Sequence, residues 1–314
     1  MRRFLSPSVT LFVIAPILAE VLPGATPPIV FLLVPPVAIW ETLLYGCGAL
    51  LVRQLARRWN GGWWTVLVLG AAYGLIEEGL SLKVIFNTAF EPAGALSTYG
   101  RVGDIATVFA AQVTVYHAVV SITIPILLTE LAFPKDRDQQ WLKPRALRFV
   151  AVLWVLALVY GFVVVHPEAP PATYGIVVGI VAVLILLAWS VRHLRSKEPG
   201  LRSRRWVPLF AAGFGGAVLF LGASWSGPDA ARPPLVSLIA QIAVVVAAAA
   251  LIRRLGRGTP LTDRDCLALA SGVLAVFIVA DLFKPAGAPL LAIVAVAMLV
   301  MLGRRISRRS DVHA

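Results

Sequence analysis

The sequence predicts an all-α integral membrane protein, and three observations lead to this prediction. The chain of 314 residues is 59% hydrophobic and 14% charged, with a mean hydropathy of +0.85. Soluble domains are about 45–50% apolar and about 25% charged. Apolar runs of about 20 residues, the length that crosses a bilayer, recur along the chain. Short hydrophilic gaps between these runs hold most of the Lys and Arg residues, as in multi-pass proteins.

The apolar runs predict ten transmembrane helices. The first is short and has a basic start, as a cleaved signal peptide does, but the next run follows almost at once, which favours a membrane helix. Pro35 and Pro36 in the second helix and Pro125 in the fourth predict kinks. The ten predicted helices cover 8–22, 28–52, 62–86, 104–133, 149–166, 174–191, 207–225, 235–252, 266–283 and 288–303.

The basic residues predict the orientation of these helices. With both termini cytoplasmic, all of the 28 Lys and Arg residues lie on the cytoplasmic side except Lys83, Arg101, Arg232 and Lys284. The net charge of +12 therefore reflects the positive-inside rule. No basic run is interleaved with aromatic residues on a soluble module, which excludes a nucleic-acid partner. We expect a multi-pass protein of the cell membrane whose partners include membrane lipid.

Buried charges divide the chain into unequal parts. Residues 1–134 form a predicted four-helix unit that carries Glu20, Glu41, Glu77, Glu78, His117 and Glu130. Glu130 lies near the cytoplasmic end of its helix, where a carboxylate reaches water. A basic cytoplasmic linker at 135–148, an apolar six-helix unit at 149–303 and a basic cytoplasmic tail at 304–314 follow.

Residues 71–87, AAYGLIEEGLSLKVIFN, place two adjacent carboxylates inside the third predicted helix. A charge at this depth costs at least a few kcal/mol, so intramembrane ionisable residues mark functional sites by default. At a rise of about 1.5 Å per residue, His117 on the fourth helix lies at a depth similar to that of Glu77 and Glu78. Glu41 on the second helix lies at about the same depth.

The helix faces agree with the depths. Gly70, Gly74 and Glu78 recur every four residues and form a small-residue stripe that allows close helix approach. Polar residues follow a neighbouring stripe on the third helix and one face of the fourth helix, and the two faces predict a small wet cavity. Its predicted substrate-binding residues are Glu41, Tyr73, Ser81, Thr114 and Ser121.

The residue types in this predicted cavity favour hydrolysis by an activated water. Two close acids in a low dielectric do not both ionise readily. One takes a proton from water while the other keeps its proton or positions a partner. A nearby His donates to the developing oxyanion. Because the chain has no HExxH motif and a single deep His among carboxylates is a thin ligand set, no metal or cofactor is predicted.

The Glu pair in EEGLSLK (77–83) and the later HAVVS (117–121) resemble motifs of the glutamate-type intramembrane proteases. These include the CAAX-prenyl-protease and bacteriocin-processing group and the PrsW-type proteases. The resemblance covers about residues 62–133. It implies that Glu77 or Glu78 is the water-activating base, that His117 is the oxyanion donor, and that the substrate is a membrane protein or peptide.

Two other functions stay open at this point. The chain is a transporter or proton-coupled permease if Glu41, Glu77 and Glu78 are titrating carriers, although no internal repeat supports paired broken helices. It is a non-catalytic membrane scaffold if the buried charges only hold helices together.

Overall fold

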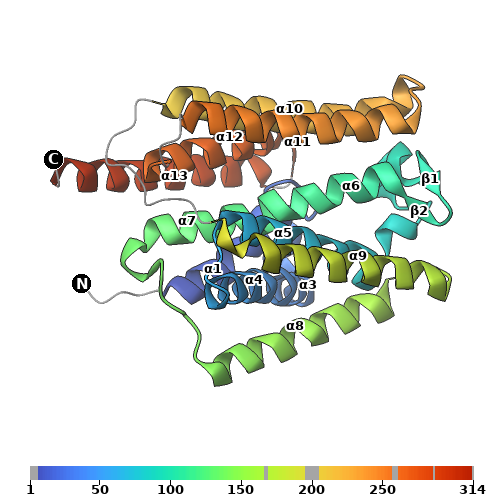
Figure 1. Cartoon of the computed structure of the whole chain (residues 1–314), viewed down its shortest axis with the longest axis horizontal. Coiled ribbons are helices and arrows are strands. Elements are labelled where there is room, and N and C mark those ends of the chain that lie inside the picture. Colours follow the sequence, from blue (N-terminus) through green and yellow to red (C-terminus); the bar gives the residue numbers. More distant parts are fainter. Residues whose placement is uncertain (1–5, 166–168, 195–204, 257–260, 286, 313–314) are drawn as a thin grey trace.

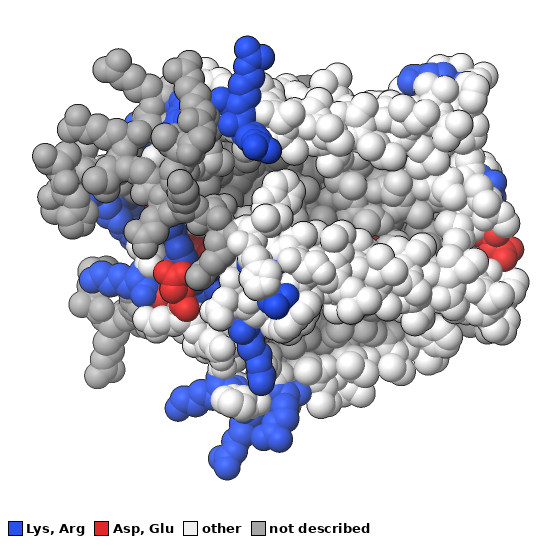
Figure 2. Space-filling model, viewed as in Figure 1, with Lys and Arg blue, Asp and Glu red and all other residues white. Residues whose placement is uncertain are grey.

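The structure is a computed structural model in which residues 6–165, 169–194, 205–256, 261–285 and 287–312 are described. The helices run roughly along one long axis, and α1 begins at the same end of the molecule at which α13 ends (Figure 1). Blue basic side chains gather at that end, whereas the middle of the face that is shown carries almost no charged side chains (Figure 2). This distribution is typical of a protein whose middle lies in lipid.

The first half of the chain contains short helices that are joined end to end. Segments η1, η2, η3 and η6 are π-helical, and η4, η5 and η7 are 3-10 helical. The elements are α1 (Pro7–Pro16), η1 (Ile17–Val21), α2 (Pro28–Leu33), α3 (Pro35–Glu41), η2 (Thr42–Gly46), α4 (Cys47–Arg58), α5 (Trp63–Leu75), η3 (Ile76–Ser81), η4 (Val84–Phe86), η5 (Glu91–Ser97), β1 (Arg101–Val102), β2 (Ile105–Ala106), α6 (Thr107–Tyr116), η6 (His117–Thr123), α7 (Ile124–Ala132) and η7 (Pro134–Asp136).

The second half consists of long helices. They are α8 (Pro144–Val164), α9 (Pro171–Ser190), the 3-10 helix η8 (Val191–His193), α10 (Trp206–Asp229), α11 (Pro234–Gly256), α12 (Asp263–Asp281) and α13 (Ala288–Val312). Their large apolar side chains, such as Leu156, Ile242 and Met298, are exposed on the surface. In a membrane protein such side chains face lipid.

Seven helical stretches among the described residues are long and apolar enough to cross a membrane. They correspond to the predicted second, fourth, fifth, sixth, seventh, eighth and tenth helices. The other three predicted helices match α1–η1, α5–η3 and α12, which are helical but are not among these seven stretches. The count of ten spans stays a prediction.

The predicted second helix, 28–52, is wrong at its start. Helix α2 stops at Leu33, Val34 leaves the helical region, and a continuous helix runs only from Pro35 to Arg58. Pro35 and Pro36 have no N–H to donate, and a proline disfavours helical backbone in the residue before it. The proline pair therefore breaks the helix instead of kinking it.

The third predicted helix, 62–86, ends early. Segment η3 stops at Ser81, and Lys83 adopts a left-handed backbone with φ of 59°. The chain then forms a compact cap over residues 83–106, where β1 and β2 pair as a two-residue antiparallel hairpin. The guanidinium of Arg101 holds this cap together by donating to the backbone carbonyls of Phe86, Ser97 and Asp104.

Helices α10–α13 lie along one side of the molecule and α8 lies along the opposite side (Figure 1). Helices α10 and α12 approach closely because Gly213 and Gly272 each face the backbone of the other helix. Helices α8 and α9 pack on α5–η3, where Gly161 meets Ser81 and Val177 meets Gly79. The division into units at 134 and 149 stays a prediction.

Candidate functional site

A buried polar cluster lies where the first, second, third and fourth predicted helices meet. The side chain of His117, at the start of η6, is its centre and is 1% exposed. Around it lie Glu77 and Glu78 of η3, Tyr45 of η2, and Tyr73 of α5. Gly74 allows α5 to approach η6 closely, because a Cβ at this position would lie only 2.7 Å from the Cβ of His117.

Both ring nitrogens of His117 have partners. Nε2 is hydrogen bonded to Oε1 of Glu78 at 2.8 Å, and Nδ1 is hydrogen bonded to the Ser121 hydroxyl at 2.9 Å. An ionised carboxylate only accepts, so the hydrogen of the Glu78 pair lies on Nε2 when Glu78 is charged. Glu78 and Ser121 thus fix the orientation of the imidazole from opposite edges of the ring.

Glu77 lies beside the same ring but is bound differently. Its Oε2 is 3.5 Å from Nδ1 of His117, and its side chain is fully buried. Neither carboxylate oxygen has a hydrogen-bond partner within hydrogen-bonding distance and angle. Buried polar groups in native proteins are almost always paired, so an unpaired carboxylate calls for a functional explanation.

Tyrosine side chains enclose the two acids and the imidazole. The ring of Tyr45 stacks on His117 at 6.1 Å between centroids, and its hydroxyl donates to Oε1 of Glu20 at 2.5 Å. Tyr73 packs edge-on against His117, and its hydroxyl donates to the backbone carbonyl of Leu44. Both tyrosines also lie beside Glu77, although neither hydroxyl forms a hydrogen bond with its carboxylate. The cluster is therefore a contiguous set of titratable side chains.

All four π-helical segments of the described chain contribute to this cluster. They supply Glu20 (η1), Tyr45 (η2), the Glu pair (η3), and His117 with Ser121 (η6). A π-helical turn shifts the phase of a helix and occurs frequently at functional sites. In η6 a local cause is present, because the ring of Pro125 crowds the carbonyl of Ser121 four residues earlier.

A comparison with protein families supplies the broader context. The model of an uncharacterized membrane protein family matches residues 9–310, nearly the whole chain. The chain belongs to this family. No curated protein and no solved structure matched the chain. Membership establishes a membrane protein, and the assignment of a chemical role to the cluster depends on its geometry.

The structure brings together five of the eight residues predicted for the site: Glu77, Glu78, His117, Tyr73 and Ser121. It places the other three elsewhere. Thr114 donates back to the carbonyl of Ala110 within α6, and Ser81 donates to the carbonyl of Leu158 on α8. Glu41 accepts from Thr26 at 2.6 Å near the cap side, with its other oxygen unpaired.

Sequence reasoning does not single out three members or neighbours of the cluster. The position of Glu20 near a helix end favours a structural role. Tyr45 does not stand out in the sequence because it is an uncharged residue in an apolar run. Tyr116 packs edge-on against His117 and donates to the carbonyl of Ala19. The spacing of four residues between Glu41 and Tyr45 is the available sequence signal, although it points to Glu41 and not to Glu20.

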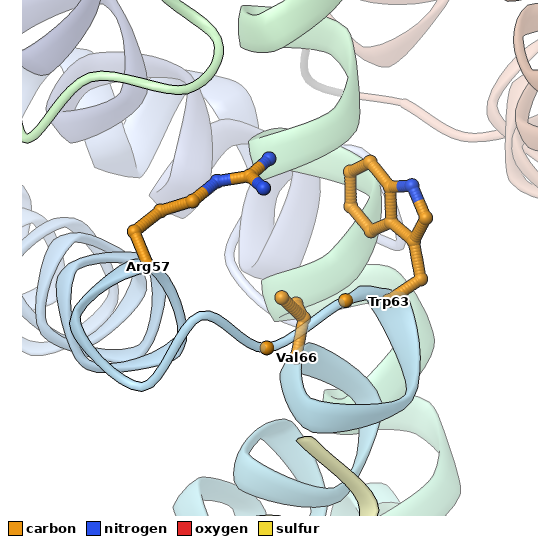
Figure 3. A pocket seen from close by; sticks show the side chains of 5 residues that line it. Arg57, Trp63 and Val66 are labelled. Atoms are coloured by element: carbon orange, nitrogen blue, oxygen red, sulfur yellow. The ribbon is translucent and has the colours of Figure 1, made fainter. Parts of the chain in front are cut away.

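The expected wet cavity is not open in this structure. Side-chain exposure in the cluster is 0% for Glu77, 1% for His117 and 13% for Glu78. A small pocket of about 30 Å³ lies instead at the turn between α4 and α5, lined by Arg57, Trp63 and Val66 (Figure 3). Among the described residues, no group of three or more His, Cys, Asp or Glu side chains is arranged to hold a metal ion.

Proposed function

We propose that this protein is a membrane-embedded, metal-independent hydrolase of the glutamate type that cleaves peptide bonds of membrane proteins. One observation carries the proposal: the fully buried Glu77 carboxylate accepts no hydrogen bond and lies 3.5 Å from an imidazole that Glu78 and Ser121 hold in place. Such a carboxylate is available to bind a water molecule and accept its proton, as a general base does.

The geometry supports separate roles for the two acids. Glu77 accepts a proton from water while the water oxygen attacks the carbonyl carbon of the substrate. His117, held by Glu78 through Nε2, donates to the oxyanion from Nδ1–H in its doubly protonated form, with the oxyanion taking the place of the Ser121 hydroxyl. The C–N bond then breaks, and the proton passes from Glu77 to the departing amine nitrogen. The partial exposure of Glu78 marks the side from which substrate enters.

The same proposal includes ten spans with both termini cytoplasmic. The basic residues that gather at one end of the molecule (Figure 2) support this orientation through the positive-inside rule. The cluster then lies nearer the outer surface, because Glu77 is only four residues, or about 6 Å, from the end of η3 at Ser81. A membrane or extracytoplasmic substrate fits this depth.

The proposal can be tested on a mixture of membrane proteins. Purified protein is reconstituted with a membrane-protein extract, and new peptide ends are identified by mass spectrometry. We expect new ends with the wild type, a loss of about 10²-fold or more with Glu77→Gln, and a comparable loss with His117→Asn. Glu91→Gln, an exposed residue of the cap, is the matched control. Equal cleavage by wild type and Glu77→Gln would refute the role of Glu77.

Proton-coupled transport is the second candidate function, and one observation favours it. The cluster is closed in this structure, and its polar groups continue outward from Glu77 through Tyr45 to Glu20. A chain of this kind suits proton movement in pumps and transporters. Proton flux into proteoliposomes that requires both Glu20 and Glu77, without any new peptide ends in the extract assay, would favour transport over hydrolysis.

A further inference from the structure

The end of α13 carries a basic face that the hydrolase proposal does not use. The helix runs 25 residues from Ala288 to Val312, nine beyond the predicted end at 303. At about 1.5 Å per residue this is about 37 Å, whereas the hydrocarbon core is about 30 Å thick. Its last turns therefore lie at the level of the lipid headgroups.

These last turns are held against the protein. Ile306 is 4% exposed and packs in a cluster with Leu131 of α7 and Leu267 of α12. Arg309 donates to the backbone carbonyl of Leu131 at 3.3 Å. Because the apolar side of the helix end is fixed in this way, its opposite side has a fixed direction as well.

Three arginines occupy that opposite side. Arg304, Arg305 and Arg308 are all exposed. At about 100° per residue they fall within an arc of about 100°, on the side away from Ile306. Among the side chains that the structure describes, which end at Arg309, none forms a salt bridge with these three arginines. At the start of α12, which packs against Ile306 through Leu267, Asp263 is paired with Arg137 at 2.8 Å.

We propose that Arg304, Arg305 and Arg308 form a binding surface for the phosphate groups of anionic lipids, which we call the arginine face. Guanidinium groups bind phosphate oxygens in a bidentate manner. Basic residues just outside a transmembrane helix attract anionic lipid. A helix that is anchored by Ile306 presents its three charges together at headgroup depth.

The test is lipid binding by the full-length protein in detergent, measured by native mass spectrometry with phosphatidylglycerol and phosphatidylcholine. We expect the wild type to prefer phosphatidylglycerol. The triple variant Arg304→Gln, Arg305→Gln, Arg308→Gln should bind it about tenfold more weakly. The corresponding triple Lys variant, which keeps the charge, should stay within about threefold of the wild type.

The control removes the same charge elsewhere at the same end of the molecule. Lys143, Arg145 and Arg148 at the start of α8 are also exposed, and their replacement by Gln should leave most of the preference for phosphatidylglycerol. Equal loss in both triple variants would overturn the proposal, because it would indicate diffuse attraction to net charge. Displacement of the lipid by millimolar inorganic phosphate would overturn it as well, because it would indicate a free-anion site.

Discussion

At the scale of single residues, Glu77 and Glu78 show how two identical neighbours acquire different environments. Successive residues of a helix point about 100° apart, so Glu78 meets Nε2 of His117 whereas Glu77 turns toward Tyr45 and Tyr73. Glu78 is hydrogen bonded to His117 and slightly exposed, whereas Glu77 is fully buried and lies 3.5 Å from the same ring without a hydrogen bond. A general base needs an oxygen that does not already accept a hydrogen bond, and both oxygens of Glu77 meet this condition.

This difference predicts opposite effects on stability. Glu77→Gln removes a buried carboxylate that accepts no hydrogen bond and has only a 3.5 Å contact with Nδ1 of His117, so we expect the free energy of unfolding to stay unchanged or rise by about 1 kcal/mol. Glu78→Gln loses a charge-assisted hydrogen bond to His117 and should cost about 1.5–3 kcal/mol. Thermal unfolding of both variants in the same detergent measures the two effects. A larger loss in Glu77→Gln than in Glu78→Gln would contradict the assignment of the two roles.

Depth and residue type suffice to select Glu77, Glu78 and His117 from the sequence, because a charge in lipid is rare and each stands out. Thr114 donates back to the carbonyl of Ala110 within its own helix, so its role in substrate binding stays a prediction. The sequence does not predict Tyr45 as a site residue, because tyrosines in apolar runs usually serve only to pack against neighbouring helices. The pairing of Tyr45 with Glu20 depends on helix packing that no local pattern encodes.

At the scale of helices, the contact between α5 and η6 positions the cluster. A Cβ on Gly70 would lie 2.9 Å from the backbone of Ala118, and one on Gly74 would lie 2.7 Å from the Cβ of His117. The small-residue stripe therefore serves the purpose that its spacing predicts. The end of η3 is less predictable, because Lys83 adopts a left-handed backbone without a glycine to signal it.

The contact between α5 and η6 predicts that one glycine-to-alanine substitution is destabilising and that a second, on α9, is not. Gly74→Ala inserts a methyl group against His117 and should destabilise the protein by about 1–3 kcal/mol through overpacking. Gly175→Ala, on α9, meets no atom within 4 Å and should be neutral or stabilising by up to about 1 kcal/mol. Chemical or thermal unfolding compares the two. Similar stability for both variants would argue against a tight α5–η6 contact.

At the scale of the whole molecule, a second buried polar cluster, formed by Glu130, Arg53 and Arg57, lies at the basic end. The sequence predicts that Glu130 reaches cytosolic water, but its side chain is 1% exposed and is bound by Arg53 at 3.1 Å and by Arg57 at 2.7 Å. Arg53 also donates to the backbone carbonyls of Arg137 and Gln139. These bonds fasten the segment after η7 to α4 and α7.

The contacts of Glu130 at the basic end are structural, and their loss should be costly. Glu130→Gln leaves the buried Arg53 guanidinium without a counter-ion, which typically costs 3–5 kcal/mol, so we expect a loss of about 3 kcal/mol or more. The measurement is the detergent unfolding midpoint, together with residual cleavage per folded molecule. Cleavage per folded molecule should be unchanged, because Glu130 lies far along α7 from His117. A selective loss of cleavage at normal stability would place Glu130 in the chemistry instead.

The membrane class and the places of the helices follow from composition and apolar runs, since burial in lipid imposes them residue by residue. The stacking of α10–α13 against the first half does not, because apolar helices of this kind offer few distinguishing contacts in sequence. Polar side chains such as Gln241, which donates to Ser224 and to the carbonyl of Val108, specify that packing only once the helices are adjacent.

In the proposed mechanism, Glu77 activates a water molecule without a metal ion. The decisive measurement is cleavage of the membrane extract in water enriched in ¹⁸O, with a strong metal chelator present. We expect each new carboxyl terminus to carry an ¹⁸O atom, the chelator to have no effect, and Glu77→Gln to yield almost no labelled ends. Chelator-sensitive cleavage, or labelled ends that persist in Glu77→Gln at wild-type levels, would contradict it.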